Sequence, residues 1–283
     1  MWEGLAQKLA WTLACKPHAA RFLAALQLVL YHRAYGRAKQ SRQHGLPGEL
    51  IISLTSFPRR FPTLQYTLQS LRDQTIRADK IILWLAEQDV PLLPEAVRKM
   101  GVRIEAVPDV RSFKKLVFAI ERYPEAFIAT ADDDVFYKPD WLEDLVEGFD
   151  PADPSIVCHR AHRLPAGIGS SIAEYREWEW DVQDEKARQP SPDLMPTGLG
   201  GVLYFPGCLH RDVTNIQAFT ELCPDADDLW FVWQAHRAGS RYKKVGKAFP
   251  LLYWAGTQTE CLFNSNADEN NVQLRRLWDT YGW

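Results

Sequence analysis

The sequence predicts an α/β protein built on a mostly parallel β-sheet that is flanked by helices. Short apolar segments rich in Val, Ile and Leu alternate with amphipathic segments of helical period from residue 49 onward. Such alternation favours parallel strands that are joined by crossover helices. With 283 residues and 46% hydrophobic content, the chain is also long and apolar enough to bury the core of such a sheet.

The first strand and helix follow each other closely. Residues 50–57 (LIISLTSF) are apolar and partly β-branched, as expected of a short buried strand. Residues 61–75 place leucines three or four positions apart, on one face of a helix. Pro62 lies near the start of this segment, where a helix tolerates the missing N–H of proline. We therefore expect a strand followed directly by a helix.

The same pattern repeats downstream of this first pair. We expect strands at residues 80–87, 102–107 and 126–131, and helices at residues 94–101 and 112–124. In parallel sheets of this kind, ligands bind outside the carboxyl ends of the strands. The residues that follow the last of these strands are therefore expected at the mouth of a binding site.

The first 48 residues differ from the rest of the chain. They hold seven Lys and Arg residues against one Glu, and apolar residues recur at helical spacing over 5–13 and 22–30. We expect a basic amphipathic helical extension over residues 1–48 and one domain over residues 49–283, with the polar stretch around residues 40–49 as the linker. Helices of this type can lie on an anionic membrane surface or pack on the domain, and the pattern fits both cases.

Composition excludes several classes of function. The net charge of −3 and the lack of a dense Lys/Arg block argue against a nucleic-acid partner. The five cysteines are widely spaced with no C-x-x-C pair, which disfavours a zinc site and fits a reducing compartment. The longest apolar run is about half of the roughly 20 residues that span a membrane, and no signal-peptide cleavage pattern follows it. We expect a cytoplasmic protein, with peripheral contact to the inner face of the plasma membrane through residues 1–48.

Three consecutive aspartates, Asp132, Asp133 and Asp134, follow the fourth predicted strand. Adjacent carboxylates near a low-dielectric interior repel one another, so a cation is expected nearby. In an extended chain, side chains two apart point the same way, and Asp132 and Asp134 could then share one ion. Carboxylate oxygens suit Mg²⁺ or Mn²⁺, which also take diphosphate oxygens as ligands. A shift of one residue would make Asp133 a ligand, and the alternative is that the triplet caps the following helix.

A second acidic motif lies about 90 residues further on. Asp225, Asp227 and Asp228 precede an apolar helical segment that stops at Gly239. Acids at a helix N-terminus contribute about 0.3–1 kcal/mol each through the helix dipole, so a purely structural role is one interpretation. The other is a general base that takes a proton from an attacking hydroxyl group.

Taken together, five segments resemble bacterial nucleotide-sugar glycosyltransferases of the GT-A fold, most like family 2. They are SLTSFPRRFPTLQYTLQSLRDQT, ADKIILWL, ATADDDVFYKPDWL, PTGLGGVLY and CPDADDLWF, and they occur in the family's order between residues 49 and 256. The resemblance implies a nucleotide-sugar donor, with a UDP-sugar favoured. It also implies Mn²⁺ or Mg²⁺ at the D-x-D motif, Asp132 and Asp134, and a catalytic base at Asp228, with Asp227 as the next candidate.

The resemblance also implies two halves and a set of nucleotide contacts. Residues 49–134 would bind the nucleotide and residues 135–283 the acceptor. The remaining candidate contacts to nucleotide or diphosphate are Ser53 or Thr55, Glu87 or Asp89, Lys114 or Lys115, Arg59 or Arg60, and Asp132 and Asp133 of the triplet. Gly198 to Gly201 (GLGG) resemble the segment before the acceptor-side strand, where a backbone without Cβ can approach a sugar.

The function expected from this resemblance is metal-dependent, inverting sugar transfer to a glycan or lipid-linked glycan, in capsule or surface polysaccharide biosynthesis. One alternative is a sugar nucleotidyltransferase, but SLTSFPRRFPTLQ lacks the glycine-rich loop usual after the first strand of such enzymes. A second alternative is a non-catalytic glycan-binding protein on a decayed transferase fold. The presence of both acidic motifs argues against decay, because clustered charges near a cleft are costly to keep.

Overall fold

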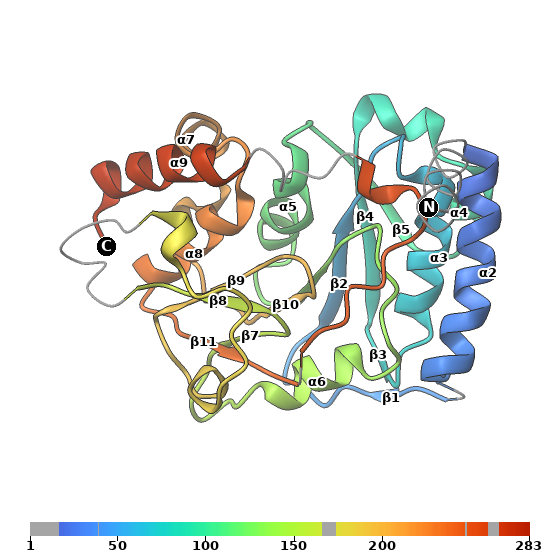
Figure 1. Ribbon diagram of the computed structural model, residues 1–283, viewed down its shortest axis with the longest axis horizontal. Coiled ribbons are helices and arrows are strands. Elements are labelled where there is room, and N and C mark those ends of the chain that lie inside the picture. The colour runs from blue at the N-terminus through green and yellow to red at the C-terminus, as the bar shows by residue number, and fades with distance from the viewer. Residues whose placement is uncertain (1–16, 39, 166–173, 247, 260–265) are drawn as a thin grey trace, which may run out of the picture.

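The computed structural model describes residues 17–38, 40–165, 174–246, 248–259 and 266–283 (Figure 1). Its main sheet has seven strands in the order β11-β7-β10-β6-β2-β4-β5. Their bounds are β2 (Leu50–Thr55), β4 (Lys80–Ala86), β5 (Arg103–Val107), β6 (Phe127–Ala131), β7 (Ile156–Cys158), β10 (Val202–Tyr204) and β11 (Tyr242–Lys244).

Most neighbouring strands of this sheet run parallel, which confirms the predicted fold class. β2 pairs in parallel with β4 and with β6, and β4 pairs in parallel with β5. β10 is inserted between β6 and β7 and runs antiparallel to both. β7, β10 and β11 have three residues each, too few to show a strand period, and were not assigned from the sequence. The register places Leu54 beside Ala131, so β2 and β6 end at the same edge.

Helices cover both faces of the sheet. They are α3 (Phe61–Arg72), α4 (Glu95–Arg98), α5 (Lys114–Arg122), α6 (Trp141–Gly148), α7 (Ile216–Leu222), α8 (Asp227–Arg237) and α9 (Asn266–Tyr281). The short 3₁₀ helices are η1 (Glu87–Leu92), η2 (Arg111–Phe113), η3 (Tyr175–Glu177), η4 (Glu185–Arg188), η5 (Arg211–Thr214) and η6 (Thr257–Thr259).

The alternation of side chains along β2 explains the two layers. Leu50, Ile52 and Leu54 pack with the leucines of α3, whereas Ile51 packs with Leu116 of α5 on the other face. The strand is buried on both faces, as expected of a central strand in a parallel sheet.

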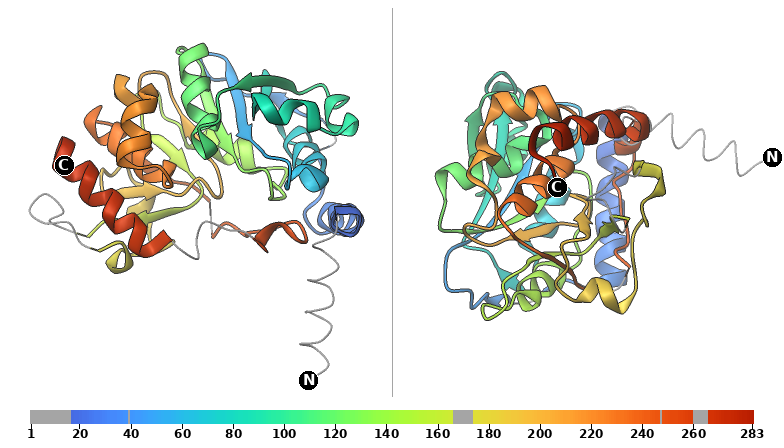
Figure 2. Two further views of the ribbon diagram at one scale, coloured as in Figure 1. Left: turned by 90° about the horizontal axis from the view of Figure 1, so that it is seen from above. Right: turned by 90° about the vertical axis from the view of Figure 1, so that its left-hand side faces the viewer.

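The helix predicted at residues 22–30 is confirmed as part of α2 (Pro17–Tyr35), whereas residues 5–13 lie outside the described residues. α2 packs against α3 at the outer edge of the molecule (Figure 2). The predicted linker contains a short strand, β1 (Arg42–Gln43), that pairs in parallel with β3 (Ile76–Arg77). The segment is therefore held against the domain. Within the described ranges, no helix is both long enough and apolar enough to cross a membrane.

The part of the chain after β6 carries a smaller sheet of β8 (Ala161–Arg163) and β9 (Leu194–Pro196). α8 packs against β9, and α9 packs against α7 and α8 (Figure 1). This layer brings the second acidic motif, at the start of α8, toward the edge of the main sheet where β6 ends.

Candidate functional site

The aspartate triplet begins where β6 ends, and the chain then turns at Asp133 and Asp134. The extended geometry that would align Asp132 with Asp134 is therefore not what the backbone adopts. The turn is fixed by the segment around Trp254, whose N–H donates to the carbonyl oxygen of Asp134 at 3.0 Å. The N–H of Phe136 donates to the carbonyl oxygen of Leu252 at 2.9 Å in the same way. As a result, the three carboxylates have different neighbours.

Lys115 links the two acidic motifs. Its Nζ lies 3.2 Å from Oδ1 of Asp132 and 3.2 Å from Oδ2 of Asp227, and its side chain is buried. Burial alone would lower the pKa of this lysine, but the charges of Asp132, Asp227 and Asp228 hold it well above the usual value. The group therefore remains an ammonium ion, and it supplies the cation that clustered carboxylates require.

Asp227 has an incompletely satisfied carboxylate. Its Oδ2 is buried and, among the described residues, has no hydrogen-bond partner, although the Lys115 ammonium lies 3.2 Å away. The contact is close enough for an ion pair but lacks the direction of a hydrogen bond. A buried oxygen without a donor costs about 1–3 kcal/mol, and the ion pair with Lys115 offsets part of this cost.

Asp228 is held by a backbone N–H group. Both of its carboxylate oxygens accept from the N–H of Gly198, at 3.0 and 2.9 Å. Burial first, and then the charge of Asp227, raise the pKa of Asp228 to about 7, while Lys115 acts in the opposite direction. Its carboxylate is therefore a much stronger base than an exposed aspartate.

The glycines of the GLGG segment are needed for close packing at the site. A Cβ on Gly198 would lie 2.7 Å from Nζ of Lys115 and 3.0 Å from Oδ1 of Asp228. A Cβ on Gly201, whose φ is +95°, would lie 2.6 Å from the ring of Trp141. The indole N–H of Trp141 donates to the carbonyl oxygen of Gly200 at 2.6 Å. The segment therefore lies against both the charged cluster and the core.

Arg60 compensates the negative charge of Asp134, the last residue of the triplet. It forms an ion pair with Asp134, which also accepts a hydrogen bond of 2.7 Å from Nε2 of Gln258. Asp133 accepts a hydrogen bond from the hydroxyl of Ser56. Burial and the charge of Asp134 raise the pKa of Asp133 to about 7, and burial also raises the pKa of Asp134. Arg60, one of the two candidate arginines, thus lies at the triplet.

Two of the predicted contact residues have structural partners. Ser53 is fully buried, and its hydroxyl donates to the carbonyl oxygen of Lys115 and accepts from Nε1 of Trp84 at 2.8 Å. The hydroxyl of Thr55 donates to the carbonyl oxygen of Trp84 at 2.9 Å. Ser53 therefore fixes the backbone of Lys115.

Other candidates lie apart from the charged cluster. Lys114 forms an ion pair with Asp109, so of the two adjacent lysines only Lys115 reaches the acids. Glu87 is exposed in η1, and Asp89 is partly exposed there. Asp225, the first acid of the second motif, forms an ion pair with Arg111.

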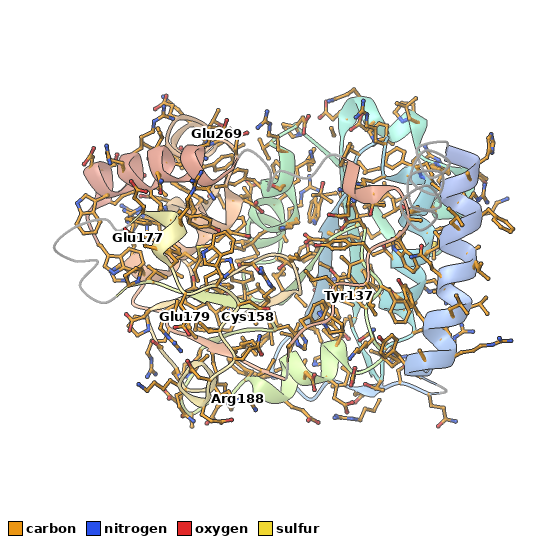
Figure 3. All side chains as sticks on the ribbon, in the orientation of Figure 1. Tyr137, Cys158, Glu177, Glu179, Arg188 and Glu269 are labelled. Carbon is orange, nitrogen blue, oxygen red and sulfur yellow. The ribbon has the colours of Figure 1, made fainter. Side chains whose placement is uncertain are left out.

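Three further residues border the site without any local signal in the sequence. The buried Tyr137 (Figure 3) accepts a hydrogen bond of 2.7 Å from the N–H of Asp132. Gln258 reaches Asp134 from 124 residues away. The pKa of Tyr175 rises to about 12, chiefly through burial and then through the charge of Asp228. The contact of Gln258 joins distant segments and that of Tyr137 depends on the local turn, and neither has a periodic signal in the sequence.

The chain matches the model of a known protein family. The model for glycosyl transferase family 2 matches residues 54–201, which is more than half of the chain. This match begins at Leu54 near the end of β2, includes the aspartate triplet and the GLGG segment, and ends before the second acidic motif. Among curated proteins, no match is found.

Several solved structures resemble the chain. A 4-diphosphocytidyl-2C-methyl-D-erythritol synthase from Anaerococcus prevotii is 9% identical, with 78% of this chain and 97% of that chain covered and a TM-score of 0.43. A cytidylyltransferase from Leptospira borgpetersenii is 10% identical, with 76% and 78% covered and a TM-score of 0.41. A glucosyl-3-phosphoglycerate synthase from Mycobacterium tuberculosis is 15% identical, with 44% and 46% covered and a TM-score of 0.29.

Proposed function

This chain belongs to glycosyl transferase family 2, and we propose that it is a metal-dependent, inverting glycosyltransferase. It would move a sugar from a nucleotide-sugar donor, with a UDP-sugar favoured, to a hydroxyl group of a glycan or lipid-linked glycan. The observation that carries this proposal is the contact of Lys115 with both Asp132 and Asp227. The contact joins the triplet at the end of β6 to the acids that begin α8.

Asp228 is the proposed base. A general base works best when its pKa is near the working pH, and the pKa of Asp228 is about 7. In the reaction, the Asp228 carboxylate accepts the proton of the acceptor hydroxyl while the hydroxyl oxygen bonds to the anomeric carbon. The bond from that carbon to the diphosphate breaks on the opposite face, so the anomeric configuration is inverted. Asp227 would hold the Lys115 ammonium beside the base through their ion pair.

Asp132 and Asp134 are the proposed metal ligands. In the described part of the chain, no group of three or more His, Cys, Asp or Glu side chains is placed to hold an ion alone. Mg²⁺ and Mn²⁺, however, are commonly held by one or two carboxylates together with substrate phosphates, so an ion here would not need Asp132 and Asp134 to point the same way. An ion bound there would neutralise charge that develops on the leaving diphosphate. Arg60 and Lys115, already paired with these carboxylates, would then be free to contact the same phosphates.

The wider assignment extends this proposal to the rest of the chain. Residues 49–134 would bind the nucleotide, with Thr55, Glu87, Asp89 and Asp133 as candidate contacts, and residues 135–283 would bind the acceptor. The acceptor would be a growing capsular or surface polysaccharide at the cytoplasmic face of the membrane. Support comes from the order of the motifs along the chain and from their meeting at one edge of the sheet.

Nucleotide binding and turnover together test the proposal. Calorimetric titration with UDP, GDP and CMP, each with Mn²⁺ and then with chelator, should give metal-dependent binding of one nucleotide. Asp134→Ala should abolish this binding. Asp228→Asn should keep it but lose sugar transfer. The exposed Asp279→Asn on α9 serves as the matched control for both.

Two results would overturn the proposal. Folded protein that binds no nucleotide under any of these conditions would leave the acidic motifs as helix caps and ion-pair partners. Release of inorganic diphosphate from a nucleoside triphosphate and a sugar 1-phosphate would instead identify a nucleotidyltransferase.

A further inference from the structure

Helix α2 has two different faces. Ala20 and Ala24 are buried on the inner face, which packs on α3 and on the cluster around Phe136 and Trp254. The opposite side carries four large apolar side chains that are exposed to solvent, which we call the outer face. They are Phe22 (72% exposed), Leu26 (50%), Val29 (49%) and Leu30 (49%).

The outer face is a continuous stripe. Its residues follow the spacing i, i+4, i+7 and i+8, which places them on one side of a helix. α2 lies along the right-hand edge of the molecule in Figure 1 and at its right-hand end in the left view of Figure 2, and the exposure of these four side chains shows that the described residues leave this side open. Single exposed apolar residues are ordinary on protein surfaces, but a stripe of four on one helix marks an interaction surface.

The charges around the outer face indicate which partner it fits. Arg21 and Arg33 are exposed, and neither has an ion-pair partner within the described ranges. α2 itself contains no Asp or Glu. Two copies of this helix packed face to face would bring arginines together without compensating acids. A surface of lipid phosphates offers the opposite charge together with an apolar layer beneath it.

We propose that the outer face of α2 docks on an anionic lipid surface. Its four apolar side chains enter the boundary between headgroups and acyl chains, and Arg21 and Arg33 lie at the level of the lipid phosphates. This inference rests on the helix alone and does not depend on the proposed sugar transfer.

The inner face relates this docking surface to the candidate site. Nε2 of Gln27 donates to the carbonyl oxygen of Tyr253 at 3.1 Å, and its Oε1 accepts from the N–H of Ala255 at 2.8 Å. Between them, the N–H of Trp254 donates to the carbonyl oxygen of Asp134. Docking through α2 would thus set the orientation of the aspartate triplet relative to the membrane.

Vesicle flotation with the full chain tests the proposal. The probes are vesicles of phosphatidylcholine, with and without phosphatidylglycerol. We expect binding to the anionic vesicles that decreases with salt. The variant F22Q/L26Q/V29Q should weaken this binding by about tenfold or more, because it removes most of the inserted apolar surface and keeps helix propensity. R21E/R33E should weaken binding to anionic vesicles alone.

The control variant is L92Q/V272Q, which changes two apolar residues that are similarly exposed, at 61% and 51%, on other parts of the surface. It should bind as the parent does. Circular dichroism and melting temperature check that each variant is folded. A separate measurement by analytical ultracentrifugation reports the oligomeric state.

Three results would overturn the proposal. Equal binding to neutral and anionic vesicles would show that the arginines do not contribute and that the partner is not specifically an anionic surface. Unchanged binding of F22Q/L26Q/V29Q would show that another segment contacts the lipid. A parent protein that ignores vesicles but is a dimer, and becomes a monomer in F22Q/L26Q/V29Q, would make the outer face a contact between two copies of the chain.

Discussion

The N–H of Gly198 donates to both carboxylate oxygens of Asp228, at 3.0 and 2.9 Å. The GLGG segment therefore fixes the orientation of the proposed base, and it does so through a residue that has no side chain. Lys115 lies next to this contact, since a Cβ on Gly198 would meet its ammonium group. Backbone, base and buried cation thus form one unit.

Replacing the proposed base should reduce turnover without loss of fold. Asp228→Asn keeps the shape of the side chain but cannot accept a proton, so we expect kcat to decrease by about 10²–10⁴-fold. Affinity for the nucleotide should change little. Steady-state kinetics together with nucleotide titration check both points. A variant that retains parental kcat would exclude Asp228 as the base.

Gly198→Ala should impair the site more than the fold. The added Cβ would lie 2.7 Å from the flexible end of Lys115, which can move aside at low cost. The displaced ammonium would leave Asp132 and Asp227 without their cation. We expect sugar transfer to decrease by about tenfold or more, with a melting temperature within a few degrees of the parent. Full activity in this variant would show that the position of Lys115 is not critical.

Gly201→Ala should have the opposite effect. Here the Cβ would meet the rigid ring of Trp141 at 2.6 Å, and the φ of +95° is unfavourable for alanine. Overpacking and backbone strain each cost about 1–3 kcal/mol. We expect the free energy of unfolding to decrease by about 2 kcal/mol or more, as measured by urea denaturation. A stability equal to that of Gly198→Ala would contradict the close packing against Trp141.

The activity should depend on pH through Asp228. The base must be ionised, and its pKa is about 7, so kcat/KM should rise as pH increases through about 7. The charged groups that act on it are Asp227, Lys115 and Asp132. A value of kcat/KM that stays constant between about pH 6 and 8 would contradict the assignment of Asp228 as the base.

The same group predicts how stability changes with pH. The folded pKa is above the unfolded value of about 3.9, so the folded state binds the proton more tightly. This contribution is fully present below about pH 4 and is lost as pH rises through about 7. Asp228→Asn should therefore reduce the fall in melting temperature over this range. An unchanged fall would assign it to other carboxyl groups, such as Asp133.

Gln27→Ala should weaken nucleotide binding from a distance. Gln27 makes two hydrogen bonds with the segment that carries Trp254. Without them, this segment would hold the backbone of Asp134 less firmly. We expect the Kd for the nucleotide with Mn²⁺ to rise by about tenfold, with vesicle binding unchanged because Gln27 is not on the outer face. Gln217→Ala on the exposed side of α7 is the control. An unchanged Kd would show that the hydrogen bonds of α2 do not affect nucleotide binding at the site.

Local sequence patterns were enough to predict the α/β layers and the residue types of the site. The short apolar runs at residues 50–57 and 126–131 predicted β2 and β6, because strand propensity is a local property of the chain. The triplet at the end of β6 and the acids that begin α8 were predicted from the same kind of local pattern and from family resemblance.

Which side chains meet depends on the three-dimensional packing. Sequence could not separate Lys114 from Lys115, and the fold directs Lys115 alone to the acids because Lys114 pairs with Asp109. It also could not show that Gln258 contacts Asp134, since the two residues are 124 positions apart. Such contacts depend on how helices and loops pack across the sheet. Packing of distant segments leaves no periodic signal along the chain.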